Sequence, residues 1–128
     1  MTDIRVIRST ERDVAEADAT SGMVREQALS GSGVWAGLVR TAPGRPSGWH
    51  HHGENDTYFY VAHGPVLMEF GPDGAKHVEA GPGDFVHVPK RVVHRERNPA
   101  GEEGAVILFR VGTGPAVVNV EGPDSSDL

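Results

Sequence analysis

The sequence contains no cysteine among its 128 residues. A disulfide scaffold, a cysteine nucleophile, a thiolate metal site and an iron–sulfur cluster are therefore excluded. The chain also lacks a run of about 18 apolar residues, so we expect no membrane-spanning helix and no membrane partner. Its first residues, Met-Thr-Asp-Ile-Arg, contain no apolar core of a signal peptide. These absences favour a cytoplasmic protein.

Positive charge is scarce and scattered. The chain has 12 Lys and Arg residues against 18 Asp and Glu residues, which gives a formal net charge of −6 with neutral histidine. A nucleic-acid interface needs basic residues that gather on one face or along one element. No such cluster is visible in the sequence, so we expect no nucleic-acid partner.

Glycine and proline are abundant, with 17 and 9 residues, and they divide the chain into short apolar segments. This spacing of turn residues is typical of an all-β sandwich or barrel, and nothing in the sequence indicates a long helix. We expect one domain with its core at about 23–120, an N-terminal edge strand (Ile4, Val6) and loop within 1–22, and a polar tail at 121–128. The predicted strands are 23–29, 34–41, 49–52, 57–62, 66–70, 75–79, 85–88, 92–96, 105–111 and 116–120.

Three of the seven histidines are consecutive, at His50, His51 and His52. Side chains alternate along a strand, so His50 and His52 share one face, about 6.5 Å apart at the backbone. Two such imidazoles can converge on one ion, and Zn, Fe, Ni or Cu suits imidazole. The alternative is one histidine packed in the core and two in water.

His94 is the candidate for a third metal ligand. Its strand is apolar, with Val92 and Val93 before it, so a buried histidine without a metal is the alternative. A metal site needs at least three protein ligands, however. His94 would supply the third if its strand folds back beside His50 and His52.

The spacing of these residues resembles two motifs of the cupin family. The first motif is Gly, five residues, His-x-His, three or four residues, Glu, six residues, Gly. The second is Gly, five residues, Pro, one residue, Gly, two residues, His, three residues, Asn. Four of five positions match in each motif, and the two motifs span residues 44–98. The positions are Gly44, His50, His52, Thr57 and Gly64 in the first, and Gly83, Pro89, Arg91, His94 and Asn98 in the second.

The resemblance implies a double-stranded β-helix, or jelly roll, with a pocket inside the barrel. It implies a divalent metal such as Fe, Zn, Ni or Mn, held by His50, His52 and His94. The expected function is a metal-dependent enzyme of the dioxygenase, isomerase, cyclase or lyase type, with a small organic molecule as substrate. The alternative is a non-catalytic cupin that binds a small molecule and has a degraded or empty metal site. The resemblance also implies a homodimer.

Two positions depart from the family pattern. Thr57 stands where the motif has its Glu ligand, and a neutral hydroxyl is a poor substitute for a carboxylate. Asp56 or Glu54 could act as the fourth ligand or general base, or water or substrate could fill an open position. Arg91 stands where the second motif has its middle Gly, which usually marks a turn.

Four residues are expected to line the substrate pocket. Thr57 and Phe59 share a face of their strand and are assigned to the interior. Trp49 shares a face with His51 and points away from the site, unless a turn at Gly48 tilts it across the barrel mouth. His87 is the fourth candidate, although it alternates with Val86 and Val88 along its strand.

Overall fold

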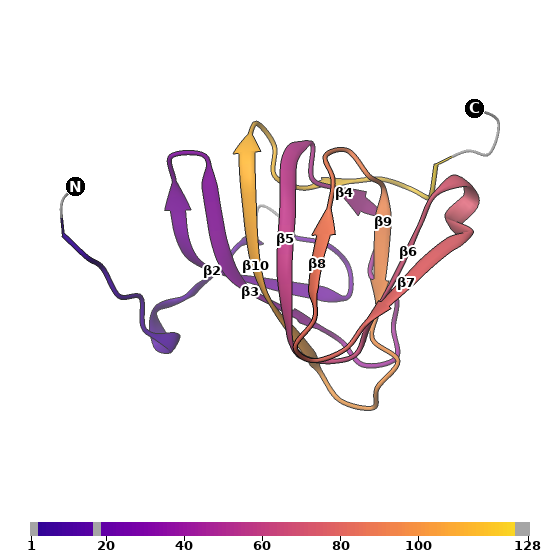
Figure 1. Ribbon diagram of the computed structural model, residues 1–128, viewed down its shortest axis with the longest axis horizontal. Helices are drawn as coiled ribbons and strands as arrows, with labels where there is room; N and C mark the ends of the chain where they lie inside the picture. The colour runs from indigo at the N-terminus through magenta and orange to yellow at the C-terminus, as the bar shows by residue number, and fades with distance from the viewer. Residues whose placement is uncertain (1–2, 17–18, 125–128) are drawn as a thin grey trace.

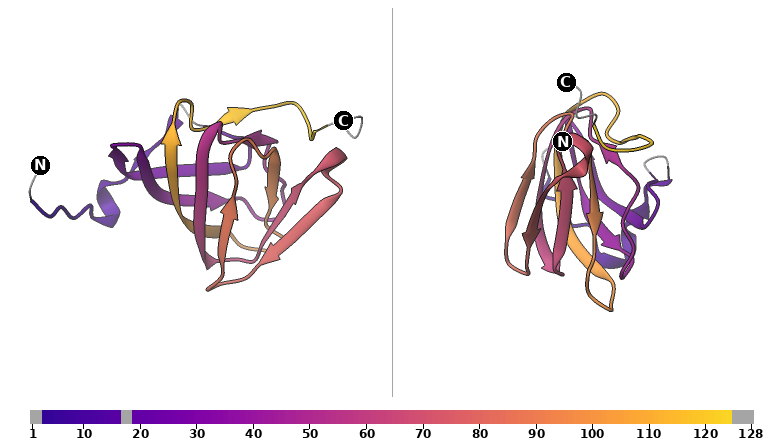
Figure 2. Two further views of the ribbon diagram at one scale, coloured as in Figure 1. Left: turned by 45° about the horizontal axis from the view of Figure 1, so that its top comes forward. Right: turned by 90° about the vertical axis from the view of Figure 1, so that its right-hand side faces the viewer.

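The computed structural model describes residues 3–16 and 19–124. Its strands form two antiparallel sheets that face each other across an apolar interior (Figures 1 and 2). The predicted all-β fold is confirmed. The last described residues lie at the end of the barrel opposite the N-terminal segment (Figure 1).

The two sheets share the strands almost equally. The six-stranded sheet has the order β1 (Asp13–Val14), β2 (Met23–Gly31), β3 (Val34–Thr41), β10 (Gly104–Thr113), β5 (Glu54–His63) and β8 (Phe85–Val88). The five-stranded sheet has the order β11 (Val118–Asn119), β4 (His50–His51), β9 (His94–Arg97), β6 (Val66–Phe70) and β7 (Lys76–Ala80). The described residues also include two short 3₁₀ turns, η1 (Ser9–Glu11) and η3 (Pro72–Gly74).

Alternation of buried and exposed side chains along β5 and β10 builds much of the core. In β5, Thr57, Phe59 and Val61 are buried, whereas Tyr58 and Tyr60 are exposed. Burying an apolar side chain such as that of Phe59 or Val61 stabilises the fold by roughly 1.5–3 kcal/mol. The inward residues of both sheets form one apolar cluster: Trp35, Val39, Phe59, Val61, Val66, Met68, Ala80, Val88, Val106 and Leu108.

Two local predictions were wrong. Ile4 and Val6 do not lie in an edge strand; their side chains are 98% and 61% exposed, and the first strand begins at Asp13. The strand predicted at 57–62 is longer than expected, because β5 begins at Glu54 and ends at His63. The strand is longer than predicted because β10 continues to Thr113, which pairs with Glu54.

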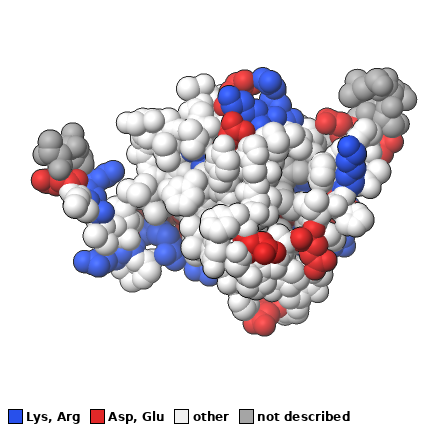
Figure 3. All heavy atoms as spheres, viewed as in Figure 1, with Lys and Arg blue, Asp and Glu red and all other residues white. Residues whose placement is uncertain are grey.

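The outer face of the six-stranded sheet carries few charges at its centre. Figure 3 shows this face over β10, β5 and β8, with most of the acidic and basic side chains towards its margins. In the described residues, no helix is long and apolar enough to cross a membrane.

Candidate metal centre

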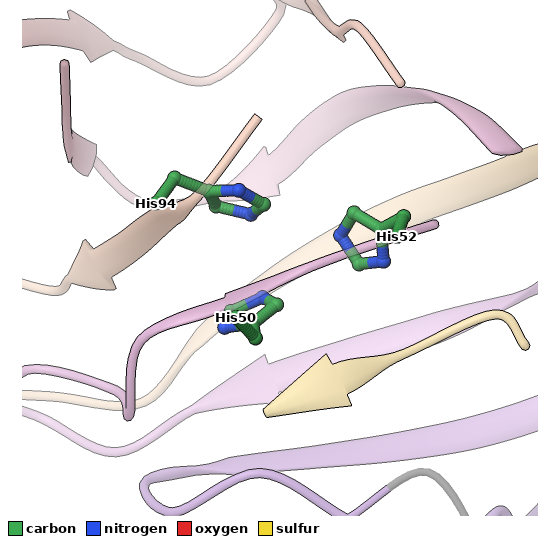
Figure 4. Close-up of side chains that lie close together, drawn as sticks. All are labelled: His50, His52 and His94. Atoms are coloured by element: carbon green, nitrogen blue, oxygen red, sulfur yellow. The ribbon is translucent and has the colours of Figure 1, made fainter. Parts of the chain in front are cut away.

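Strand pairing brings the three predicted histidines together. β4 pairs with β9 so that His50 lies directly opposite His94. His52 follows two residues after His50 and therefore returns to the same face of the strand. One ligand atom from each residue lies within 4.8 Å of the other two. Figure 4 shows the three rings, which are only 4.4–5.2 Å apart between centroids.

Each imidazole in this cluster is fixed by a backbone carbonyl. The Nδ1 atoms of His50, His52 and His94 lie 2.9, 3.0 and 2.8 Å from the carbonyl oxygens of Gly48, Ala116 and Val92. A carbonyl oxygen only accepts hydrogen bonds, so Nδ1 must carry the proton in all three rings. In the neutral ring, Nε2 then keeps its lone pair, which is the tautomer that a metal ligand needs.

Gly53 allows the carbonyl that holds His52 to approach. Its φ is +56°, a left-handed conformation that favours glycine. A Cβ atom at this position would lie 2.7 Å from the carbonyl oxygen of Pro115. The glycine therefore lets the segment before β11 pass close enough for Ala116 to accept the hydrogen bond from His52.

Burial keeps the cluster uncharged. His50, His52 and His94 are 0%, 3% and 2% exposed. Desolvation, together with the nearby His94, lowers the pKa of His50 and of His52 to about 2. Desolvation lowers the pKa of His94 to about 4. Neutral imidazole is the form that binds a metal ion, so no proton has to leave at neutral pH.

The donor set fits a divalent ion. His50 Nε2 is buried and has no hydrogen-bond partner among the described residues. A buried polar atom without a partner is costly, and a bound ion would satisfy it. Among the residues that the structure describes, no carboxylate joins the three imidazoles in the cluster.

The structure places Asp56 and Glu54 away from this cluster. The Asp56 carboxylate bonds His87 Nε2 at 2.9 Å, and Asp56 precedes the outward-facing Tyr58 by two residues. Glu54 pairs with Arg91, and both side chains are more than half exposed. Alternation along β5 directs both carboxylates outward, so this arrangement does not support a fourth-ligand role for either.

Of the predicted pocket residues, Thr57 and Phe59 do face the interior. Phe59 is 2% exposed and belongs to the apolar core. Thr57 is 1% exposed, and its Oγ1 has no hydrogen-bond partner among the described residues. The motif position that lacks Glu therefore presents a small buried hydroxyl.

The rings of Trp49 and His87 contact side chains on the outer faces of the two sheets. The Arg95 guanidinium lies 4.7 Å from the centroid of the Trp49 ring, on the outer side of the five-stranded sheet. The His87 ring stacks on Tyr58 with centroids 4.8 Å apart, on the outer side of the six-stranded sheet. His87 is nevertheless one of the residues that line the cavity beside His94, whereas Trp49 is not among them.

An apolar cavity adjoins the cluster through His94. Its volume is about 160 Å³, and it lies between β8 on one sheet and β6, β7 and β9 on the other. His94 belongs both to the histidine cluster and to the cavity wall, so a molecule in the cavity would contact the cluster there. The lining residues are Met68, Phe70, Val78, Val86, His87, Val88, Pro89, Val92 and His94.

Three buried charged residues near the cluster were missed by the sequence reasoning. Arg110 is 1% exposed; it donates to the same Ala116 carbonyl as His52, and its guanidinium lies 4.2 Å from the Trp35 ring centroid. Arg25 is 3% exposed, and its charge lowers the pKa of all three clustered histidines. Desolvation raises the pKa of Glu96, two residues after His94, to about 7. Arg110 could have been noticed, because it interrupts an apolar strand at an inward position.

Arg91 keeps the turn that the missing glycine would make. Its φ is +61°, in the left-handed region. Its backbone N–H donates to the Gly53 carbonyl at 3.0 Å, which ties the turn before β9 to the turn after His52. The exposed Arg91 side chain projects away from the barrel.

These features define a double-stranded β-helix barrel with a buried imidazole cluster between its two sheets. Residues 37–111, more than half of the chain, match the sequence model of the cupin domain. The chain therefore belongs to the cupin family. No curated protein matches its sequence.

Three solved structures show the same fold at low sequence identity. A polyketide cyclase from Streptomyces resistomycificus is 17% identical, with a TM-score of 0.73 over 92% of this chain and 86% of that one. A conserved Klebsiella pneumoniae protein with a double-stranded β-helix domain is 16% identical, with a TM-score of 0.67 over 77% and 84%. Oxalate decarboxylase from Bacillus subtilis is 22% identical, with a TM-score of 0.66 over 78% of this chain and 28% of that one.

Proposed function

We propose that this cupin is a metal-dependent enzyme acting on a small organic molecule, with His50, His52 and His94 as the metal ligands. The observation that carries the proposal is that all three Nδ1 atoms bond to backbone carbonyls, which leaves three Nε2 lone pairs in a buried cluster. The structurally similar oxalate decarboxylase is described with Mn(II) centres, which supports a metal in this fold.

A bound divalent ion would supply Lewis-acid or redox chemistry, depending on its identity. The chain itself would hold the substrate in the apolar cavity beside His94 and keep water away from it. The size and apolar lining of this cavity favour a small, largely apolar substrate. The comparisons with a polyketide cyclase and a decarboxylase support small-molecule chemistry and leave the reaction open.

A non-catalytic small-molecule-binding cupin is the second candidate. The specific observation that favours it is the replacement of the motif Glu by Thr57, with no carboxylate from the described residues in the cluster. Such a protein would bind a small molecule in the same cavity without turning it over.

The metal content of tag-free protein tests the proposal. We expect about one equivalent of Fe, Zn, Ni or Mn per chain in the wild type, and a loss of at least about tenfold in His94→Ala, because two ligands do not hold the ion. Elemental analysis gives the stoichiometry, and circular dichroism checks that the variant folds.

Two matched variants control this experiment. His77→Ala removes an exposed histidine, and Asp56→Asn removes a carboxylate that bonds His87 on the outer face. Both should retain the wild-type metal content. Wild-type protein that takes up no metal after incubation with each ion would contradict the metal centre and favour the binding protein.

A further inference from the structure

We propose that Arg110 and Thr57 form a binding site for the carboxylate group of the ligand, inside the barrel beside the histidine cluster. The inference rests on the proposed function, because it assigns this ligand to the same interior, and it goes further by naming the substrate class. That class is small molecules with an apolar body and one carboxylate. Neither residue is a proposed metal ligand, so the carboxylate site and the metal centre can be tested separately.

β10 brings a positive charge into the barrel at Arg110. Its neighbours Phe109 and Val111 are exposed, whereas Arg110 itself is 1% exposed. Its Nη1 donates to the Ala116 carbonyl at 3.2 Å, and its guanidinium lies 4.2 Å from the Trp35 ring centroid. These contacts hold the guanidinium in place. Arginine stays charged at every physiological pH, so the interior contains a fixed cation.

The charge of Arg110 acts on the histidine cluster. The Ala116 carbonyl that accepts from Arg110 also accepts from His52 Nδ1, at 3.0 Å, so the guanidinium and the imidazole are neighbours. Besides desolvation, the charge of Arg110 lowers the pKa of His52. Burial raises the pKa of Glu96, and the charge of the buried Arg25 opposes that shift. Even with Glu96 ionised, these two arginines and one glutamate carry a positive net charge, which favours an anionic ligand.

Thr57 adds a hydroxyl next to this guanidinium. The strand register pairs Arg110 of β10 with Thr57 of β5, and both side chains face the interior. Thr57 is 1% exposed, and its Oγ1 is buried without a hydrogen-bond partner among the described residues. A hydroxyl can donate to a carboxylate oxygen, and that bond would satisfy the buried atom. The planar guanidinium in turn matches both oxygens of a carboxylate.

The apolar cavity leads to this pair of residues. Val88 lines the cavity together with His94, and the register places Thr57 opposite Val88. Adjacent strands lie about 4.8 Å apart, so a carboxylate on a ligand in the cavity has to extend only about that far to reach Thr57. Threonine is shorter than the glutamate of the cupin motif, which leaves room here for a carboxylate supplied by the ligand. The apolar lining of the cavity suits the rest of such a molecule.

Binding of benzoate and benzamide tests the carboxylate site. The two molecules have nearly the same shape, and only benzoate carries a carboxylate. We expect benzoate to bind the wild type at least about tenfold more tightly than benzamide, because its hydrogen bonds to the guanidinium are charge-assisted. Titration calorimetry measures both dissociation constants in the full chain, as purified and after the metal has been stripped and the chelator removed.

Four variants locate the preference for benzoate. Arg110→Met should reduce it to about twofold or less, because a neutral side chain of similar length replaces the guanidinium. Arg110→Lys keeps the charge without the paired N–H groups and should retain part of the preference. Thr57→Glu should abolish benzoate binding without lowering the metal content, since it puts a carboxylate of the chain beside Arg110. Arg40→Met is the matched control: it removes an arginine that pairs with Glu26 on the outer face, and the preference should not change.

The outcomes separate the carboxylate site from the metal centre. A wild type that binds neither molecule, or binds both equally, would overturn the inference. An Arg110→Met variant that keeps the wild-type preference, or a Thr57→Glu variant that still binds benzoate, would do the same; circular dichroism checks that each variant folds. A preference for benzoate in a protein that takes up no metal would contradict the metal centre and support the carboxylate site. A metal-loaded protein without this preference would give the reverse result.

Discussion

His50 and His87 both lie in β-strands of one small barrel, yet their surroundings differ completely. His50 is fully buried, bonds a backbone carbonyl through Nδ1 and leaves Nε2 without a hydrogen-bond partner among the described residues. His87 has nearly half of its side chain exposed, bonds Asp56 and stacks on Tyr58. The first environment leaves an imidazole nitrogen available to a metal ion, and the second gives a half-exposed histidine–aspartate pair that also borders the cavity. The direction of the side chain from its strand decides which environment each histidine meets.

The same division between inner and outer faces should appear in stability. We expect Phe59→Ala to lower the free energy of unfolding by about 3–5 kcal/mol, because it leaves a cavity in the apolar core. Tyr58→Ala, one residue earlier and 44% exposed, should cost under about 1 kcal/mol in the monomer. Urea unfolding of dilute protein measures both values. Equal losses in the two variants would show that β5 does not alternate as the structure has it.

The pH dependence of stability tests whether the three clustered histidines are buried in their neutral form, unlike an exposed histidine such as His87. An unfolded chain protonates its histidines near pH 6.5, whereas burial keeps His50, His52 and His94 neutral down to about pH 2, 2 and 4. Below pH 6.5 the unfolded state therefore binds more protons, and stability falls as the pH falls. Glu96 acts in the opposite direction between pH 4.5 and about 7, because its folded form keeps a proton that its unfolded form has lost.

Between pH 7 and pH 5.5, the stability lost through the three histidines exceeds the stability gained through Glu96. We expect metal-free protein to lose roughly 2–3 kcal/mol of unfolding free energy between pH 7 and pH 5.5. Unfolding by urea at a series of pH values, in the presence of a chelator, measures the change. His94→Leu should make the pH dependence of stability shallower, since it removes one of the three histidines whose pKa differs between the folded and unfolded states. A flat profile in the wild type would mean that the three imidazoles are not buried in their neutral form.

Alternation and motif spacing were enough to predict the all-β fold and the meeting of the three histidines. The parity of His50 and His52 can be read directly from the sequence, and the spacing of the two motifs indicated that His94 would join them. The same alternation places Asp56 and Tyr58, two residues apart, on the outer face of β5. The sequence alone was therefore enough to exclude Asp56 from the predicted metal site. Trp49 directly precedes the inward-facing His50, so alternation likewise directs Trp49 outward.

Other features of the site depend on contacts that no local pattern encodes. The carbonyl that fixes His52 belongs to Ala116, 64 residues further along the chain. That contact needs the approach of Pro115 to Gly53, which only the folded barrel defines. Arg25 and Glu96 are buried because β2 and β9 turn these side chains inward, and charged residues are ordinarily expected at the surface.

Arg91 provides the smallest test of the same contrast, because its backbone serves the site while its side chain faces solvent. Arg91→Gly should remove a left-handed strain of about 1 kcal/mol. It should also lose an exposed ion pair with Glu54, worth under about 1 kcal/mol, and add backbone freedom to the unfolded chain. These effects nearly cancel, so we expect stability within about 0.5 kcal/mol of the wild type and unchanged metal content. Arg91→Ala is the matched comparison: it loses the ion pair but keeps the strain, so it should be less stable than Arg91→Gly in the same unfolding experiment. The reverse order would mean that the side chain of Arg91, rather than its backbone conformation, holds the turn before β9.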